Sequence, residues 1–600
     1  MTEPNTVLAP SVRKGMEWER AFCAAHGIPF LGILPHDRLR SILAYRNDRR
    51  LYRRKCDWSG ESIISCYHAD TLFPVIKSEL WWGDGWEGVE YALSAQPEVS
   101  FFEQFAALQR RVPREATTVV NAENSSYNSH TRDSKNCYLS HLAFRCEDIL
   151  YSYWSVNCKD NMDCLYAADS TLCCECAYVL NCYNCIQLEE GAGCHDCYFS
   201  YQLRGCDHCL FCSNLVSKSY HIENKPCAPA EFEARRAALL DRSAASYASA
   251  VTRFVSMRDQ SPKRALHALN CEDVSGEHIQ NCKSCLHAFD ARESRDCFNV
   301  TNGGGCDIYH GYSVGFPSCE VAYCSVTIRN SKEIFFCANC WDSHALWYCD
   351  NCVNCSDCFG CVGLKRKQYC VFNVQYTSED YHRLFGAWRE AMLTRGEWGH
   401  FFPLQLSPFC YNESVAQDLF SLSREQIATR GCRYREASEL LEIGEGDRTL
   451  QPGVRLSIDS LSGGEILSCE RCSQRYRVVK KEVELLRQWG VPPQARCPDC
   501  RMLSRLERRP PYQLFSRTCA HCHQEIESAY EVGVAPTLLC EECFLGNCER
   551  GAASDVICFQ RSAFSFLLTA SDAAAAFGRS SSRQSFGRKA ERRGKLLMRQ

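Results

Sequence analysis

The sequence has no run of about 18 apolar residues, and its start, MTEPNTVLAPSVRK, lacks the pattern of a secretory signal. We therefore expect neither membrane spanning nor export, and the default is a cytoplasmic protein. An excess of one charge is also missing, because 68 Lys and Arg against 72 Asp and Glu give a net charge of −4. Such a balance gives no overall bias toward nucleic acid. The sequence contains no P-loop, GxSxG, HExxH or Rossmann pattern, so we predict no catalytic residue and no enzyme.

Cysteine is the residue in excess, with 45 in a chain of 600 residues. A chain of this length is too long for one hydrophobic core and predicts several domains. In a reducing compartment so many thiols indicate metal ligands or small buried apolar groups in preference to a disulfide framework.

Two stretches repeat a short phrase of a polar residue, usually Cys, and two or three apolar residues. The phrases of the first stretch include DCLYA, ECAYV and DCYFS, and their key residues are 137, 149, 164, 176, 185, 197, 209 and 220. The key residues of the second stretch are 285, 297, 308, 321, 334, 346, 358 and 369. Both have a step of about 12 residues, too short for a helical-hairpin repeat. Cys206, Lys218 and Asn224 meet Cys355, Lys367 and Asn373 at one common shift, which indicates a duplication.

Short apolar phrases between turn residues predict strands, and a period of about 12 residues predicts two β-solenoid-like arrays. We expect Cys at the inward positions, because a narrow interior suits a small apolar side chain. The stretches from Ala228 (APAEFEARRAALLDR) and Thr377 (TSEDYHRLFGAWREAML) predict helices that cap the arrays.

Many array cysteines are spaced three residues apart, as in Cys182 and Cys185. One interpretation is a ladder of thiolates that holds zinc or Fe–S, because soft ligands at this spacing can chelate. We favour the other, stacked core thiols, because a pair repeated in nearly every unit resembles a packing rule and not a single site.

Four Cys-x-x-Cys pairs near the end predict metal sites of another kind. Their cysteines are Cys469, Cys472, Cys497, Cys500, Cys519, Cys522, Cys540 and Cys543. Two quartets of cysteines predict about two zinc ions in treble-clef or ribbon-like modules, where tetrahedral ligation leaves no position for substrate. Which pairs share an ion stays open, and His521 and His523 are either alternative ligands or solvent-facing.

The segment from Glu19 to Cys56 repeats this C-terminal frame without most of its ligands. At the shift that places Cys56 on Cys519, HGIP aligns with WGVP. The other ligand positions hold Leu34, Asp37, Ser59, Lys77 and Leu80. We expect a degenerate zinc-finger-like module in which Trp81, Trp82 and Trp86 replace the metal cross-link by buried area.

Both copies keep a basic arm with interleaved aromatic residues. The candidate nucleic-acid contacts are Arg46, Arg49, Arg50, Arg53, Arg54, Lys55, Arg501, Arg505, Arg508 and Arg509. Such an arm beside a zinc knuckle suits the phosphate backbone. A solvated helix face with i,i+4 ion pairs is the alternative.

The chain from about residue 33 to 545 resembles a family of large Cys-rich, zinc-ribbon-like proteins from uncultured, small-genome bacteria. The resemblance is carried by YRNDRRLYRRKCDWSGESIIS, WWGDGW, FFEQF, NAENSSYNS, CFGCVGLKRKQYCVFN, GEWGHFFPLQLSPFCYNESVAQ and CPDCR with CEECF. Members usually have a CPxCR pair near the start, from which Leu34 and Asp37 depart. The resemblance implies one coherent full-length fold and adds no mechanism.

We expect a mainly β protein with some α-helix, divided into seven parts. They are a degenerate N-terminal module (1–112), the first array (113–227), a helical cap (228–260), the second array (261–376), a helical cap and linker (377–460), two four-cysteine zinc modules (461–550) and a basic disordered tail (551–600). The function that this organisation predicts is a zinc-binding scaffold that engages RNA, DNA, a ribonucleoprotein or a protein. The alternatives are a metal-storage or thiol-redox protein that uses the cysteine ladder, and an enzyme whose polar residues converge between the arrays.

Overall fold

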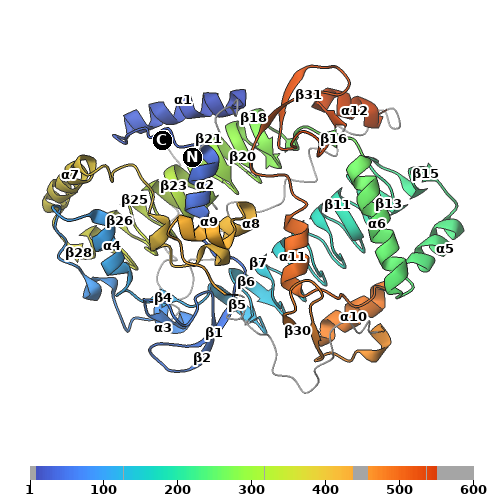
Figure 1. Cartoon of the computed structure of the whole chain (residues 1–600), viewed down its shortest axis with the longest axis horizontal. Coiled ribbons are helices and arrows are strands. Elements are labelled where there is room, and N and C mark those ends of the chain that lie inside the picture. Colours follow the sequence, from blue (N-terminus) through green and yellow to red (C-terminus); the bar gives the residue numbers. More distant parts are fainter. Residues whose placement is uncertain (1–7, 126, 316–317, 437–456, 536, 550–600) are drawn as a thin grey trace, which may run out of the picture.

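The computed structural model describes residues 8–125, 127–315, 318–436, 457–535 and 537–549. The fold is mainly β with some α-helix, and two long, parallel-rich sheets dominate it (Figure 1). The predicted basic tail at 551–600 lies outside the described residues. None of the helices in the described ranges combines the length and apolarity needed to traverse a lipid bilayer.

The first array is an eleven-stranded sheet whose strands follow one another in chain order. Its strands are β5 (Val119–Glu123), β6 (Thr131–Lys135), β7 (His141–Phe144), β8 (Tyr153–Val156), β9 (Leu165–Ala168), β10 (Ala177–Leu180), β11 (Ile186–Ala192), β12 (His195–Tyr201), β13 (Asp207–Leu210), β14 (Ser219–Ile222) and β15 (Lys225–Pro226). Neighbours are parallel, and Cys197 pairs with Cys209, which pairs with His221. The register therefore advances by the predicted 12 residues. The last pair, β14 and β15, is antiparallel.

The second array is a ten-stranded sheet, again in chain order. Its strands are β18 (Glu272–Glu277), β20 (Lys283–Phe289), β21 (Ser294–Thr301), β22 (Gly305–Val314), β23 (Cys319–Ile328), β24 (Ser331–Phe335), β25 (His344–Trp347), β26 (Ser356–Phe359), β27 (Gln368–Val371) and β28 (Val374–Gln375). Cys285 pairs with Cys297, which keeps the step of 12, but Cys306 pairs with Glu320. The period is thus interrupted between β22 and β23.

A three-residue rhythm runs within each 12-residue unit. Asn136, Leu139, Leu142 and Arg145 have φ values of 54°, 47°, 57° and 53°, in the left-handed region. The residues that directly follow them are buried, and they are Cys137, Ser140, Ala143 and Cys146. Asn and Asp recur at the left-handed positions, where a short polar side chain is tolerated best. A cysteine spacing of three therefore places successive thiols inside the array.

The predicted phrases do not all form strands. Those at Cys137 and Ile149 form isolated parallel bridges, Tyr138 with Leu150 and Leu150 with Met162. The strands of these units, β7 and β8, lie a few residues further along the chain. An apolar phrase alone does not decide which side of a unit has the regular hydrogen-bond ladder.

A helix follows each array at the predicted place. α5 (Pro229–Leu239) packs on β14 and is followed by α6 (Ala244–Gln260), which packs on β12. α7 (Ser378–Thr394) packs on β27, and the Thr377 side chain caps it by accepting a hydrogen bond from the Asp380 amide at 3.2 Å. The connection to the C-terminal part contains η2 (Leu404–Leu406), η3 (Tyr411–Glu413), α8 (Val415–Leu419), α9 (Arg424–Thr429) and η5 (Ile458–Ser460).

The two terminal parts share one order of elements. The N-terminal part contains α1 (Pro10–Ala25), α2 (Pro35–Leu43), β1 (Tyr52–Lys55), β2 (Ser62–Ser65), β3 (Val75–Ile76), α3 (Ser78–Trp82), η1 (Gly88–Tyr91), α4 (Phe101–Gln109) and β4 (Arg114–Glu115). The C-terminal part contains β29 (Ile466–Ser468), β30 (Arg475–Arg477), α10 (Lys480–Trp489), α11 (Pro498–Leu506), β31 (Phe515–Thr518), β32 (Glu525–Ser528), β33 (Leu538–Leu539) and α12 (Glu541–Glu549).

Strand pairing agrees with the frame read from the sequence. β3 pairs in parallel with β4, which directly precedes the first array, and β33 pairs in parallel with β16 (Lys263–Arg264), which precedes the second. The antiparallel hairpins β1–β2 and β31–β32 also correspond. Each terminal part therefore adds a strand at the start of a different array.

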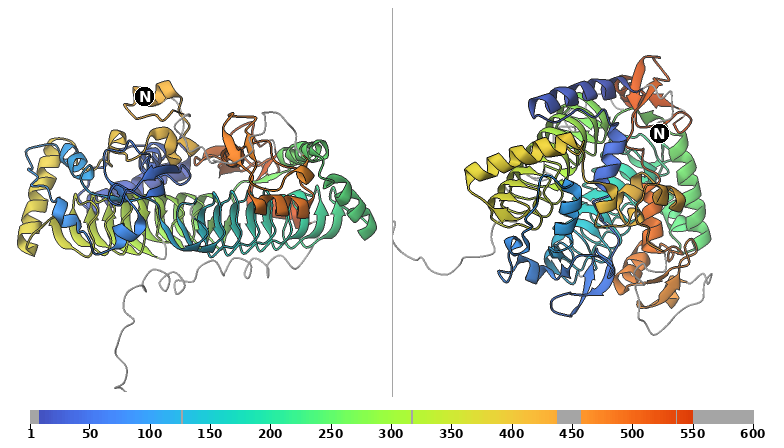
Figure 2. Two further views of the ribbon diagram at one scale, coloured as in Figure 1. Left: turned by 90° about the horizontal axis from the view of Figure 1, so that it is seen from below. Right: turned by 60° about the vertical axis from the view of Figure 1, so that its left-hand side comes forward.

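The arrays lie side by side in opposite directions. Tyr153 contacts Tyr312, with 3.2 Å between their hydroxyl oxygens, and the Tyr178 hydroxyl donates to Asp290 at 3.2 Å. Further along, Glu190 contacts His278. The residue number rises in one array as it falls in the other, which defines an antiparallel arrangement. Figure 2 shows the strands of both arrays stacked along the long axis of the molecule, with α7 and α5 toward opposite ends.

Candidate metal centres

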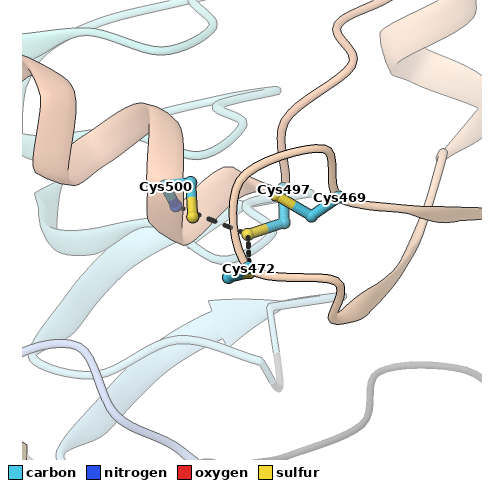
Figure 3. A group of neighbouring side chains, drawn as sticks. All are labelled: Cys469, Cys472, Cys497 and Cys500. Carbon is cyan, nitrogen blue, oxygen red and sulfur yellow. Dashed lines mark hydrogen bonds between the residues drawn. The ribbon is translucent and has the colours of Figure 1, made fainter. Parts of the chain in front are cut away.

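The first cysteine quartet joins two chain segments. Cys469 and Cys472 lie in the turn between β29 and β30, and Cys497 and Cys500 lie at the start of α11. One sulfur from each residue lies within 4.8 Å of the other three, and 3.7 Å separates Cys472 Sγ from Cys497 Sγ (Figure 3). This arrangement can hold a metal ion. It also shows which pairs combine, which the sequence left open.

The second quartet repeats this design in the next hairpin. Cys519 and Cys522 lie between β31 and β32, Cys540 directly precedes α12, and Cys543 lies in its first turn. All four sulfurs lie within 4.8 Å of one another, with Cys522 Sγ and Cys540 Sγ 3.8 Å apart. His521 is exposed, and its Nδ1 is 3.5 Å from Cys543 Sγ.

Backbone amides favour the thiolate form in each quartet. Burial raises the pKa of Cys469, but hydrogen bonds from the backbone at Cys497, Cys472 and Arg471 outweigh it and lower the pKa to about 7. In the second quartet, burial is likewise outweighed by backbone hydrogen bonds, and the pKa of Cys519 falls to about 6. The Cys540 amide donates to Cys519 Sγ at 3.3 Å. The thiolate is the form that binds metal, so these turns are prepared for a cation.

The remaining thiols of a quartet resist ionisation next to the first. Burial and then the neighbouring Cys472 raise the pKa of Cys500 to about 12. A divalent cation would relieve this repulsion, because every ligand must lose its proton to bind.

The N-terminal copy forms no such quartet among the described residues. Cys56 remains in the knuckle, where the Ser59 amide approaches its sulfur at 3.5 Å. Trp81 and Trp86 are buried as predicted, whereas Trp82 is 43% exposed. The sequence did not indicate that these rings surround a lysine of the second array. Lys365 Nζ lies 4.3 Å from the Trp81 ring centroid and 4.4 Å from that of Trp86.

The cysteines of the arrays have a different environment. Cys185 Sγ lies 3.4 Å from the carbonyl oxygen of Tyr183 and 3.6 Å from that of Cys194, and this pattern recurs along both arrays. No group of three or more array cysteines, within the ranges that the structure describes, is as compact as the two quartets. Burial raises the pKa of Cys137 to about 11 and that of Cys319 to about 12. These thiols are packed in the neutral form.

The basic arms lie largely inside the molecule. Eight of the ten candidate residues form ion pairs with carboxylates: Arg46 with Asp48, Arg49 with Asp418 and Asp499, Arg50 with Asp499, Arg54 with Asp57, Arg501 with Asp163 and Glu482, Arg505 with Asp163, Arg508 with Glu189 and Arg509 with Asp290. Arg53 and Lys55 are exposed. The arm is also not one solvated helix, because α2 ends at Leu43 and β1 begins at Tyr52. Its guanidinium groups join parts of the chain that are distant in sequence.

A scan against protein-family models finds no match to this chain, and neither does a search of curated proteins. The resemblance to a Cys-rich bacterial family and the seven domain boundaries stay predictions.

Proposed function

We propose that this protein is a zinc-stabilised interaction scaffold built on two β-solenoids with about 12 residues per coil. The solenoid assignment is supported by the parallel register of 12 residues and by the left-handed residue at every third position. Each coil would bond only to its neighbours, so the ends need covering. α5 and α7 lie at those ends.

Zinc is the metal that we propose for the two quartets. Four thiolates in a closed tetrahedral set are typical of structural zinc. Each terminal module contains little core of its own, and ligation can contribute roughly 10–16 kcal/mol of apparent folding free energy. We propose a reducing compartment such as the cytoplasm, since the described array thiols are free and approach backbone carbonyls.

The separation of the two cysteine populations is the observation that carries the scaffold role. The quartets are compact and lie in turns, whereas the array thiols are dispersed along the interior. A metal-storage or thiol-redox protein would instead use the array sulfurs themselves. Their protonated, buried state favours packing over chemistry.

Elemental analysis with thiol counting distinguishes these roles. Protein purified from a reducing cytosol should contain about two zinc ions per chain, and the array thiols should react with a thiol reagent only after unfolding. Many metal ions per chain, or iron-type absorbance, would support metal storage instead.

For the partner we favour a protein over nucleic acid. The charged columns on the arrays alternate in sign: Lys159 pairs with Glu147 at 3.1 Å, and Lys332 with Glu320 at 3.1 Å. Together with the internally paired arms, this leaves the described surface without a long basic stripe, which phosphate binding needs.

A gel-shift assay with single-stranded RNA and duplex DNA tests this preference. We expect no binding at 150 mM salt. Salt-sensitive binding that is lost in an R53E/K55E variant would reverse the preference and make nucleic acid or a ribonucleoprotein the partner.

A further inference from the structure

The junction between the arrays contains a compact group of two histidines and a carboxylate. His267 directly precedes β17 (Ala268–Leu269), Glu277 ends β18, and His278 directly precedes β19 (Ile279–Gln280). One ligand atom from each of the three lies within 4.8 Å of the other two. The three side chains are 12%, 3% and 15% exposed, so the group is buried but reachable by small ions.

Each imidazole uses one nitrogen toward the first array. Gln202 Nε2 lies 2.8 Å from His267 Nε2, and Glu190 Oε1 lies 2.7 Å from His278 Nε2. Both Gln202 and Glu190 belong to the first array. Polar partners on the outer nitrogen are what orient a metal-ligating histidine and set its tautomer.

The inner nitrogens face the carboxylates of the second array. His267 Nδ1 is 2.5 Å from Glu277 Oε1, and His278 Nδ1 is 3.7 Å from Asp290 Oδ1, beyond hydrogen-bond distance. The Tyr178 ring stacks on His278 with 3.8 Å between the ring centroids and limits the movement of the imidazole. Two Nδ1 atoms and a Glu277 oxygen thus form the inner ligand set.

We propose that His267, Glu277 and His278 form a third metal site, for a divalent first-row transition ion, at the junction of the two arrays. The proton now shared by His267 Nδ1 and Glu277 leaves to solvent when the ion binds, as does any proton on His278 Nδ1. Two imidazoles and one carboxylate suit zinc, iron or cobalt, and three protein ligands leave at least one position for water.

Binding would fasten the arrays to each other. The inner ligands come from the start of the second array, and the groups that orient them come from the first. The site shares no ligand with either cysteine quartet, so its occupancy is independent of the proposed zinc scaffold.

Cobalt dialysis of the full-length, zinc-loaded protein tests the proposal, with cobalt and zinc counted together. We expect about one Co²⁺ per chain, no loss of zinc and no sulfur-to-cobalt charge-transfer absorption. Glu277→Gln and His278→Asn should each weaken cobalt binding at least tenfold. Glu190→Gln should weaken it about tenfold through His278 orientation. His344→Asn, at an exposed position of the second array, is the matched control and should leave it unchanged.

Two measurements separate this proposal from the zinc scaffold. In Cys472→Ser we expect loss of zinc with cobalt binding retained. Cobalt should also raise the thermal midpoint of the wild type and not that of Glu277→Gln, whose fold circular dichroism can verify. Absence of a cobalt ion beyond those exchanged for zinc, or equal binding by wild type and Glu277→Gln, would overturn the third site and leave the cysteine quartets unaffected.

Discussion

Arg38 and Glu19 form a buried ion pair, with 3.2 Å between Arg38 Nη2 and Glu19 Oε1. The C-terminal copy repeats it in Arg501 and Glu482, at 3.4 Å. Glu19 also accepts a hydrogen bond from Tyr323 of the second array, and Glu482 accepts one from Tyr151 of the first, both at 2.7 Å. Each terminal module is therefore fastened to the array at the other end of the chain.

We expect Glu482→Ala to lower the free energy of unfolding by about 3 kcal/mol, because Arg501 and the Tyr151 hydroxyl would lose a buried partner. Glu484→Ala, two residues away and 54% exposed, should cost less than about 0.5 kcal/mol. Urea unfolding of both variants checks this. Equal costs would mean that Glu482 contributes no more than an exposed charge does.

Cys185 tests whether thiols fill the arrays because of their size. Its side chain is fully buried, so Cys185→Leu should destabilise the protein by about 1–3 kcal/mol through overpacking. Cys185→Ala should cost about 1 kcal/mol through lost contacts. Thermal unfolding of the two variants gives the order. A leucine variant as stable as the alanine variant would indicate spare room inside the array.

Removal of one ligand from a quartet should release metal, and the degenerate module supplies the control. We expect Cys472→Ser and Cys540→Ser each to lose about one zinc per chain and to increase hydrogen exchange in the affected hairpin. Cys56→Ser should keep the full zinc content, since its module forms no quartet among the described residues. Loss of zinc from Cys56→Ser would show a metal site in the N-terminal copy.

Lys365 should stabilise the N-terminal module through the tryptophan rings that surround it. Burial lowers the pKa of this lysine to about 8, yet the rings and the Trp81 carbonyl oxygen retain the charged group. Lys365→Ala should therefore cost about 2 kcal/mol. Its neighbour Arg366 is 73% exposed, and Arg366→Ala should have little effect. Thermal midpoints that coincide would argue against a cation–π contribution.

Glu19 predicts a loss of stability in acid. Burial raises its pKa, but His310, Arg38 and Tyr323 outweigh burial and lower it to about 2. An acid with a lowered folded pKa contributes stability above its unfolded pKa of about 4.5, and this contribution disappears as the pH falls toward 2.

Comparison of wild type with Glu19→Gln measures that contribution. The stability difference should be about 3 kcal/mol at pH 6 and shrink between pH 4.5 and pH 2. Denaturant unfolding across this range is the measurement. A difference independent of pH would assign the effect to packing and not to charge.

Features that repeat along the chain could be predicted from the sequence alone. A step of 12 residues and cysteines spaced by three describe contacts between neighbouring units, so local pattern suffices to place Cys185 or Cys197 inside an array. Cys-x-x-Cys pairs at knuckle spacing likewise indicated both quartets, because ligand geometry is set largely within a short hairpin and the helix after it.

Only the tertiary structure decided what the charged residues do. Arg501 meets Asp163 and Arg49 meets Asp499 across hundreds of residues, and no local pattern encodes such a pair. The antiparallel contact of the arrays, which brings Glu190 to His278, has the same origin. Repetition and ligand spacing act over a few residues, whereas the partner of a buried charge depends on how whole arrays and modules pack.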